Sequence, residues 1–302
     1  MPPRSRLIAA LSLVAAMAFT GTNVAFGKAI AAAVPIYLFV VFRFAVASVA
    51  LAPLAHMEPG PKVACMTRAQ WRSLALMALL GMVGFTVLML EGLKRTAAAD
   101  AGIITATLPA VVAAFGLVLG GERLSRAQGL AVGLAVAGLA LVQATGAAGG
   151  TATLVGNLLV AGAVLCEASF VVLGKQLAPP YRPLRLALAA NLAGLALAAP
   201  LALLDLPGFD PGAVTSGTWL LGTWYALSAS VFCLWLWYAG LPHVETWLAG
   251  LATAAMPVAA LATSALYLGE TIGATRLAGA ALVIAGIVLG ALSAPGKGPP
   301  VG

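Results

Sequence analysis

The sequence contains very little charge for its length. Of its 302 residues 8% are charged, whereas a soluble domain carries about 25%. A soluble fold needs charged side chains on its surface, but here 62% of the residues are hydrophobic and the mean hydropathy is +1.04. The composition therefore predicts a protein that lies in a lipid bilayer. It excludes a soluble enzyme, a nucleic-acid-binding protein and a disordered chain.

Residues that would support catalysis or bind metal are equally scarce. The three cysteines, Cys65, Cys166 and Cys233, have no metal-ligand spacing and form no even set for disulfides, and the two histidines are His56 and His243. The motifs His-Glu-x-x-His and Gly-x-Ser-x-Gly are both absent. We therefore expect no enzyme, no cofactor and no metal site. An intramembrane enzyme and a channel remain as weaker alternatives.

Long apolar runs, by contrast, fill the chain. A helix needs about 20 apolar residues to cross a bilayer, and short connections separate runs of that length. The sequence predicts an all-α integral membrane protein with ten transmembrane helices, at residues 7–27, 34–55, 72–91, 96–119, 126–146, 152–174, 184–204, 219–240, 244–268 and 274–293. The first run follows two arginines, as a signal peptide would, but it exceeds the roughly 7–15 apolar residues of a signal core.

The second half of the chain repeats the first at a shift of 148 residues. Rare residues carry this evidence, and they coincide as follows: Trp71 with Trp219, Pro109 with Pro257, and Gly121-Glu122 with Gly269-Glu270. We therefore predict two five-helix repeats, at residues 1–148 and 149–302. Because five is an odd number, the second repeat is expected to lie inverted in the membrane relative to the first.

The basic residues are divided unevenly between the two sides of the predicted bundle. With a cytoplasmic N-terminus, four basic loop residues lie outside and eleven lie inside: Arg4, Arg6, Lys62, Arg68, Arg72, Arg123, Arg126, Lys175, Arg182, Arg185 and Lys297. Cytoplasmic loops carry an excess of Lys and Arg. This distribution predicts a multi-pass protein with both termini in the cytoplasm.

These features resemble the EamA-type branch of the drug/metabolite transporter superfamily. The likeness lies in the two sets of five helices, a proline in the fourth helix of each half, Gly-Glu at the turn that follows, and Arg43-Phe44 in the second helix. It covers nearly the whole chain. The resemblance implies an inner-membrane exporter of metabolites with ten helices. Amino-acid exporters, including the aromatic amino-acid branch, are prominent in that superfamily.

Polar residues inside the predicted helices mark a candidate substrate site, because each is costly in a bilayer unless it meets a partner or water. The candidate substrate-binding residues are Thr20, Asn23, Arg43, Glu167, Asn191 and Trp235. The second half departs from the family pattern, since Asn191 stands where the repeat would place the arginine and Glu167 stands at the place of Thr20. Trp235 belongs to an aromatic helix whose rings either line a cavity or face lipid.

An apolar and aromatic cavity with one or two charges suits small amphipathic solutes, whereas a phosphate site needs several Lys and Arg. We therefore expect export of amino acids, aromatic or other neutral ones, by alternating access around a cavity at mid-membrane. A multidrug-type exporter of drug-like compounds is the alternative. The expected partners are a small-molecule substrate and membrane lipid, without nucleic acid. A monomer is favoured over a dimer.

Three further motifs predict local structure. Glu122 and Glu270 directly precede the fifth and tenth predicted helices, where a carboxylate can accept hydrogen bonds from free amides. The proline in the fourth and ninth helices should kink each of them. Gly129-x-x-x-Gly133 and Gly286-x-x-x-Gly290 allow close helix contact, within the bundle rather than in a dimer.

Overall fold

The computed structural model describes residues 3–31, 33–93, 95–96, 104–144, 154–178, 180–268 and 272–293. Across these ranges the chain is helical and contains no strand. Eight helical segments among them are long and apolar enough to cross a membrane, and shorter apolar helices occupy Leu108–Leu119 and Arg126–Val142. The predicted all-α membrane class is confirmed, whereas the number ten stays a prediction.

The helices follow the predicted spans in position. Six spans are single helices: α1 (Pro3–Ala31), α2 (Ile36–Met57), α7 (Arg126–Ala144), α8 (Leu154–Leu177), α9 (Pro183–Ala202) and α14 (Ala274–Leu292). The others consist of α3 (Arg68–Met77), η2 (Ala78–Gly84) and α4 (Phe85–Leu93); α6 (Leu108–Gly120); α10 (Ser216–Leu227), η4 (Ser228–Phe232) and α11 (Cys233–Gly240); and α12 (Thr246–Thr253) with α13 (Ala255–Leu268). Short 3-10 turns η1, η3 and η5 lie at Val63–Cys65, Pro211–Ala213 and Leu241–His243.

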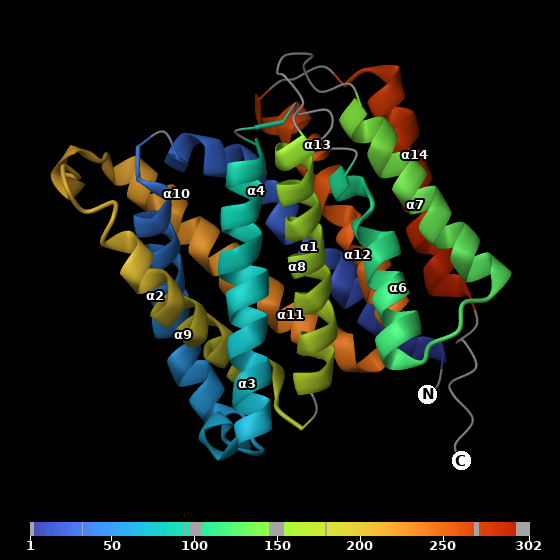
Figure 1. The fold of residues 1–302 in the computed structure, drawn as a ribbon, viewed down its shortest axis with the longest axis horizontal. Helices are drawn as coiled ribbons and strands as arrows, with labels where there is room; N and C mark the ends of the chain where they lie inside the picture. Colours follow the sequence, from blue (N-terminus) through green and yellow to red (C-terminus); the bar gives the residue numbers. More distant parts are fainter. Residues whose placement is uncertain are drawn as a thin grey trace.

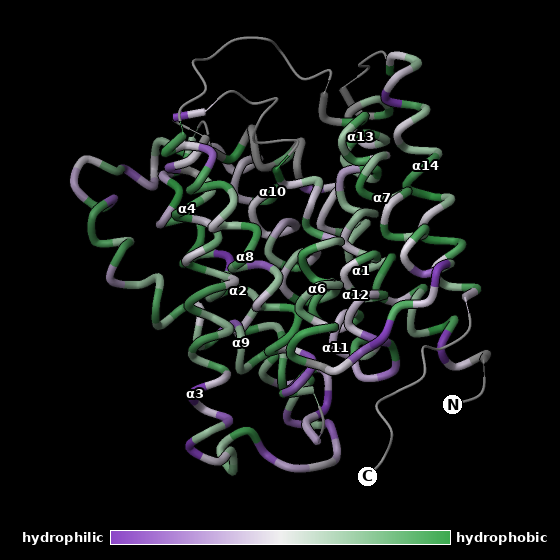
Figure 2. The backbone as a smooth tube through the Cα atoms, turned by 45° about the vertical axis from the view of Figure 1, so that its right-hand side comes forward, coloured by the Kyte–Doolittle hydropathy of each residue, from purple (hydrophilic) through white to green (hydrophobic). Residues whose placement is uncertain are grey.

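The start of α1 and the end of α14 lie together at one end of the bundle, which we call the terminal end (Figure 1). The guanidinium of Arg6 in α1 donates to the backbone oxygens of Ala291 and Ser293 at the end of α14, over 3.0 and 2.7 Å. We call the other end, where α2 begins at Ile36, the opposite end. Hydrophobic residues run along the helices, and hydrophilic residues gather in loops, especially at the terminal end (Figure 2).

The first helices of the two halves, α1 and α8, run in opposite directions. α1 begins at the terminal end, where Arg6 pairs with Glu245 at 3.1 Å. α8 ends there, because its Lys175 donates to the carboxylate of Glu122 and to the hydroxyl of Thr246, the residue after Glu245. The first helices of the two halves are therefore antiparallel.

The third helix of each half is interrupted at the same place. π-helical turns occur at Ala78–Gly84 and at Ser228–Phe232, and the 148-residue shift maps the second turn onto residues 80–84. An added residue in a helix rotates the face that follows by about 100°. The two halves therefore share an irregularity that changes which side chains of α4 and α11 face inward.

The fourth helix of each half is broken beside its proline. The helices restart at Leu108 and Ala255, just before Pro109 and Pro257. A proline has no amide hydrogen for the carbonyl four residues earlier, and its ring crowds that carbonyl. Each helix is therefore interrupted beside its proline, where the sequence predicts a kink.

Glycines bring α7 and α14 into backbone contact, and Figure 1 shows the two helices side by side. A Cβ atom on Gly138 would lie 2.6 Å from the backbone oxygen of Gly279, and the reverse distance is also 2.6 Å. Gly286, the repeat equivalent of Gly138, faces the backbone oxygen of Ala131 at 2.7 Å. Ala131 is the repeat equivalent of Gly279. Equivalent residues of the two repeats therefore make equivalent contacts where α7 and α14 cross.

The packing predictions for the two glycine pairs have different outcomes. Gly286 and Gly290 pack inside the bundle as expected, the latter against Leu251. The same prediction is wrong for Gly129 and Gly133. A Cβ atom on either would meet nothing within 4 Å among the described residues, because both lie on the exposed outer face of α7.

We predict that Gly138→Ala destabilises the protein and that Gly133→Ala does not. The new methyl group at position 138 meets a backbone oxygen, and such overpacking costs about 1–3 kcal/mol. At position 133 it meets open space and gains roughly 0.5–1 kcal/mol from the lower flexibility of the unfolded chain. Thermal unfolding of both variants in the same detergent checks this. Equal melting temperatures would contradict the close crossing of α7 and α14.

Candidate functional site

A cavity of about 560 Å³ lies between the two halves of the chain. Helices and π turns of both halves line it. The aromatic residues in its wall are Phe39, Phe85, Phe170, Tyr225 and Trp237, and its charged lining residues are Arg43 and Glu167. Cavities of a few hundred Å³ accommodate small molecules.

Equivalent residues of the two repeats line this cavity in pairs. At the 148-residue shift the pairs are Gly81 with Ala229, Met82 with Ser230, Phe85 with Cys233, Thr86 with Leu234, Met89 with Trp237, Thr105 with Thr253, and Leu108 with Met256. The first two pairs belong to the π turns η2 and η4. The irregular turns thus help to form the wall, and the cavity lies where the two halves meet.

The second helix of each half breaks this symmetry. α2 lines the cavity with Ile36, Phe39, Val40 and Arg43, whereas its equivalent α9 contributes none of the described lining residues. Asn191, at the place of Arg43, instead lies buried against η4. The cavity therefore extends toward the opposite end, where α2 begins, and not toward the terminal end.

Three of the six predicted substrate-binding residues, Thr20, Arg43 and Glu167, line the cavity. The hydroxyl of Thr20 lies 3.1 Å from the Sγ atom of Cys233. The guanidinium carbon of Arg43 lies 4.5 Å from the ring centroid of Phe44, and its Nε atom is buried without a hydrogen-bond partner in the described ranges. No ion pair joins Arg43 to Glu167 in the part of the chain that the structure describes.

The two predicted asparagines support the wall and do not line the cavity. Asn23 is fully buried, and its Nδ2 atom donates to the Ser228 hydroxyl at 2.7 Å. Asn191 is equally buried and donates to the backbone oxygen of Ser230 at 3.1 Å. Both contacts hold the π turn η4, one from α1 and the other from α9.

The tryptophan of the predicted site faces outward. Trp235 is 44% exposed and does not line the cavity, whereas Trp237 is 2% exposed and does. Side chains two residues apart on a helix point about 200° apart, so the two cannot both face inward. Trp237 is not among the candidate residues of the sequence analysis. The four-residue spacing of Ala229, Cys233 and Trp237 is the signal that could have found it.

Hydrogen bonds around Glu122 join three segments at the terminal end. Its carboxylate accepts the backbone N–H groups of Thr246 at 2.7 Å and Trp247 at 3.3 Å, and the ammonium of Lys175 at 3.0 Å. Burial alone would raise the pKa of Glu122, but the hydrogen bonds from Thr246 and the charge of Lys175 outweigh it and hold the pKa below its usual value. The ionised carboxylate thus ties α8 and α12 to the turn before α7.

Glu122 is a helix cap, as predicted, but for a different helix. It caps the start of α12, in the other half of the chain. The start of α7 has its own cap, because Ser125 and Gln128 exchange hydrogen bonds between side chain and backbone. Glu270, the second predicted cap, lies outside the described residues.

Two segments of the chain, residues 7–144 and 154–291, match the EamA-like transporter family. The chain belongs to this family, whose domain it carries twice, and is a multi-pass membrane transporter. It is similar to Uncharacterized transporter YetK of Bacillus subtilis (strain 168), with 31% identity over 288 residues, which cover 94% of this chain and 87% of that protein. A protein of known crystal structure shares the fold, with a TM-score of 0.77 and 21% identity over 93% of this chain and 95% of its own.

We predict that Arg43 and Glu167 contribute independently to stability. Glu167→Gln removes a carboxylate without a cationic partner in the described structure and keeps its shape, so the melting temperature should stay level or rise. The loss of one member of a buried ion pair would instead destabilise strongly. Melting temperatures of Glu167→Gln, Arg43→Gln and the double variant check this, and the effects should add within about 0.5 kcal/mol. A double variant that recovers stability lost in both single variants would contradict independence.

Proposed function

We propose that the protein exports small zwitterionic solutes, aromatic or other neutral amino acids, across the inner membrane. The cavity lining carries this proposal, because it offers one cation, Arg43, and one anion, Glu167, among apolar and aromatic side chains. The guanidinium suits the carboxylate of an amino acid, and Glu167 suits its ammonium group. The aromatic rings suit an apolar side chain. A phosphorylated solute would need more positive charge than one arginine supplies.

The predicted site residues then divide into two groups. Thr20, Arg43 and Glu167 contact the substrate directly, and Trp237 takes the place that the sequence gave to Trp235. Asn23 and Asn191 act indirectly, since each holds the π turn η4 in place through a hydrogen bond.

The proposal includes ten membrane crossings in two inverted five-helix repeats, at residues 1–148 and 149–302. The short apolar helices α6 and α7 occupy the places of the fourth and fifth predicted spans, which supports the number ten. The antiparallel directions of α1 and α8 support the inversion. The excess of Lys and Arg in the loops of the terminal end supports an inner-membrane orientation with both termini in the cytoplasm.

The difference between α2 and α9 supports alternating access as the mechanism. In this conformation α2 lines the cavity and α9 is packed away. An exchange of roles between the halves would open the cavity to the terminal end. α9 would then present Ala187, Leu188 and Asn191, the equivalents of Phe39, Val40 and Arg43. The contacts of Glu122 with Lys175 and Thr246 would break in that state, because they join the two halves at the terminal end.

Counterflow in proteoliposomes tests the proposed activity. Vesicles preloaded with unlabelled phenylalanine should take up radiolabelled phenylalanine faster than empty vesicles, because a carrier exchanges substrate faster than it returns empty. Trp237→Phe removes the indole N–H from the cavity wall. The uptake rate should then fall about tenfold, because the loss of one hydrogen bond to a charged group of the substrate has about that effect. Trp235→Phe is the matched control on the outer face and should leave the rate unchanged.

Other results of that experiment would reject the proposal. Flux that preloading does not accelerate would indicate a channel. Uptake of the organic cation ethidium in place of amino acids would favour the multidrug alternative. If Trp235→Phe is impaired and Trp237→Phe is not, the substrate path lies outside the cavity described here.

Alternating access predicts opposite changes at two equivalent positions. The background for this experiment has serine in place of the three native cysteines. In it, Ala187→Cys should react slowly with a membrane-impermeant maleimide because position 187 is buried, whereas Phe39→Cys should react faster because position 39 lines the cavity. Adding Glu122→Gln weakens the contact with Lys175 and should raise labelling at position 187 at least threefold while lowering it at position 39. The measurement is the labelling rate in vesicles opened to both sides. A rise at both positions would mean general loosening and would contradict the exchange of states.

A further inference from the structure

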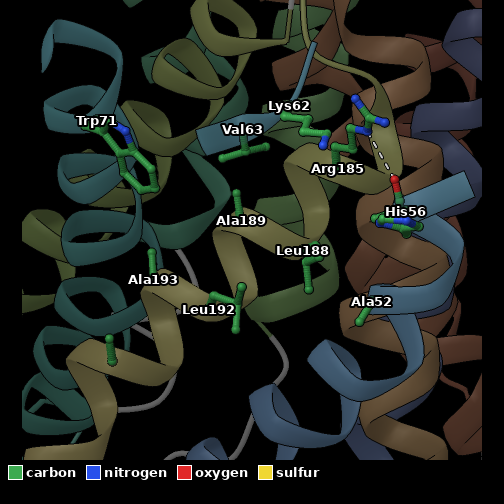
Figure 3. Close-up of a pocket in the computed structure, with 12 residues that line it drawn as sticks. Ala52, His56, Lys62, Val63, Trp71, Arg185, Leu188, Ala189, Leu192 and Ala193 are labelled. Carbon is green, nitrogen blue, oxygen red and sulfur yellow. Dashed lines mark hydrogen bonds between the residues drawn. The ribbon is translucent and has the colours of Figure 1, made fainter. Parts of the chain in front are cut away.

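A second hollow lies away from the central cavity, near the terminal end. Its volume is about 630 Å³, and its walls come from α2, the following loop with η1, the start of α3, and α9. Figure 3 shows Lys62, Arg185 and His56 together on one side of it, with the apolar side chains of α9 leading away from them. We call it the basic groove.

The basic groove is polar at one end and apolar along the rest. Beyond the three basic residues its lining consists of alanine, valine and leucine side chains and Trp71. Trp71 is an exposed residue at the start of α3, as is typical of a tryptophan at a membrane–water interface. The polar end therefore lies at the level of lipid headgroups, and the apolar part lies deeper.

The length of the groove fits one lipid leaflet. Its α9 wall runs from Arg185 to Ala196, which is about 16 Å at 1.5 Å per residue. Half of a bilayer core of about 30 Å is about 15 Å. An acyl chain that follows α9 from the headgroup level would therefore reach the middle of the membrane.

The surroundings of the polar end carry an excess of positive charge. Among the exposed basic residues, Lys62 lies in the loop between α2 and α3, Arg68 and Arg72 lie in the first turns of α3, and Arg182 directly precedes α9, whose first turn contains Arg185. Glu58 is the acidic residue between α2 and α3. The carboxylate of Glu58 is occupied, because it accepts the backbone N–H groups of Leu184 and Arg185 at the start of α9. It does not pair with any of these cations in the described structure.

Arg185 is held in place by backbone oxygens. Its Nε atom donates to Ala55 at 3.1 Å, and its two terminal nitrogens donate to Gly60 and Glu58. These contacts fix the guanidinium at the groove without neutralising it, since carbonyl groups carry no net charge. Each terminal nitrogen keeps one further N–H. Lys62, whose side chain is exposed beside it, adds a second cation.

We propose that the basic groove binds one anionic glycerophospholipid, with its headgroup phosphate at Lys62 and Arg185 and an acyl chain along α9. The charge selects an anionic headgroup, and the apolar wall selects a molecule with a long chain. Basic pockets between transmembrane helices are a recurrent mode of headgroup binding.

Phosphatidylglycerol and phosphatidylcholine, added to the full-length protein in detergent, test this site by native mass spectrometry. Phosphatidylglycerol should bind as one tight copy, several-fold more strongly than phosphatidylcholine. Lys62→Gln should weaken phosphatidylglycerol binding about fivefold, which corresponds to about 1 kcal/mol for one basic residue. Arg72→Gln makes the same charge change on the neighbouring helix outside the groove and should have less than a twofold effect.

A second pair of variants tests the acyl-chain part. Ala196→Phe fills the far end of the groove and should weaken binding, whereas Ala199→Phe, exposed on the same helix outside it, should not. Inorganic phosphate, which has no chain, should not compete. Equal binding of the two lipids, equal losses for Lys62→Gln and Arg72→Gln, or displacement by phosphate would each overturn the proposal.

Discussion

A bilayer offers no hydrogen-bond partner to a polar side chain, and this constraint decides where the two halves of the chain join. Asn23 in the first half donates to Ser228 in the second. Glu122 in the first half accepts from Lys175 and Thr246 in the second. The second set of contacts lies at the terminal end, and at the opposite end the backbone N–H of Tyr37 in the first half donates to Asp205 in the second at 2.8 Å. The central cavity occupies the space between the two halves.

Hydrophobicity and rare residues were enough to predict the helices and the repeat. The predicted run 184–204 corresponds to α9 at Pro183–Ala202, and 126–146 to α7 at Arg126–Ala144. The interruptions of the third and eighth runs were not predictable in this way. A π turn is a change in backbone hydrogen bonding within an apolar stretch, and no residue type marks it. The repeat shows that the change is systematic, since it occurs at equivalent positions.

For the candidate site, the cost of charge in a membrane singled out two residues that line the cavity, whereas the sequence did not show which way the side chains of each helix point. Arg43 and Glu167 line the cavity because a charged group inside a span needs a polar or open surrounding. The asparagines satisfy the same requirement by hydrogen bonding to neighbouring helices, so a polar residue in a span indicates a partner and not always a cavity. Which of Trp235 and Trp237 faces the cavity depends on the helix rotation after η4, and the sequence does not specify that rotation.

The separation of Arg43 from Glu167 has a consequence for what the cavity can hold. If the two side chains formed an ion pair, a substrate would have to break it, and the gain from binding would be offset by that loss. In the described structure each charge is instead available at the wall, where an unpaired charge is costly to keep in an apolar setting. A zwitterion relieves both costs at once, whereas a solute with a single charge relieves one and leaves the other. Under the proposed function, the arrangement would therefore discriminate between solutes by the number and sign of their charges.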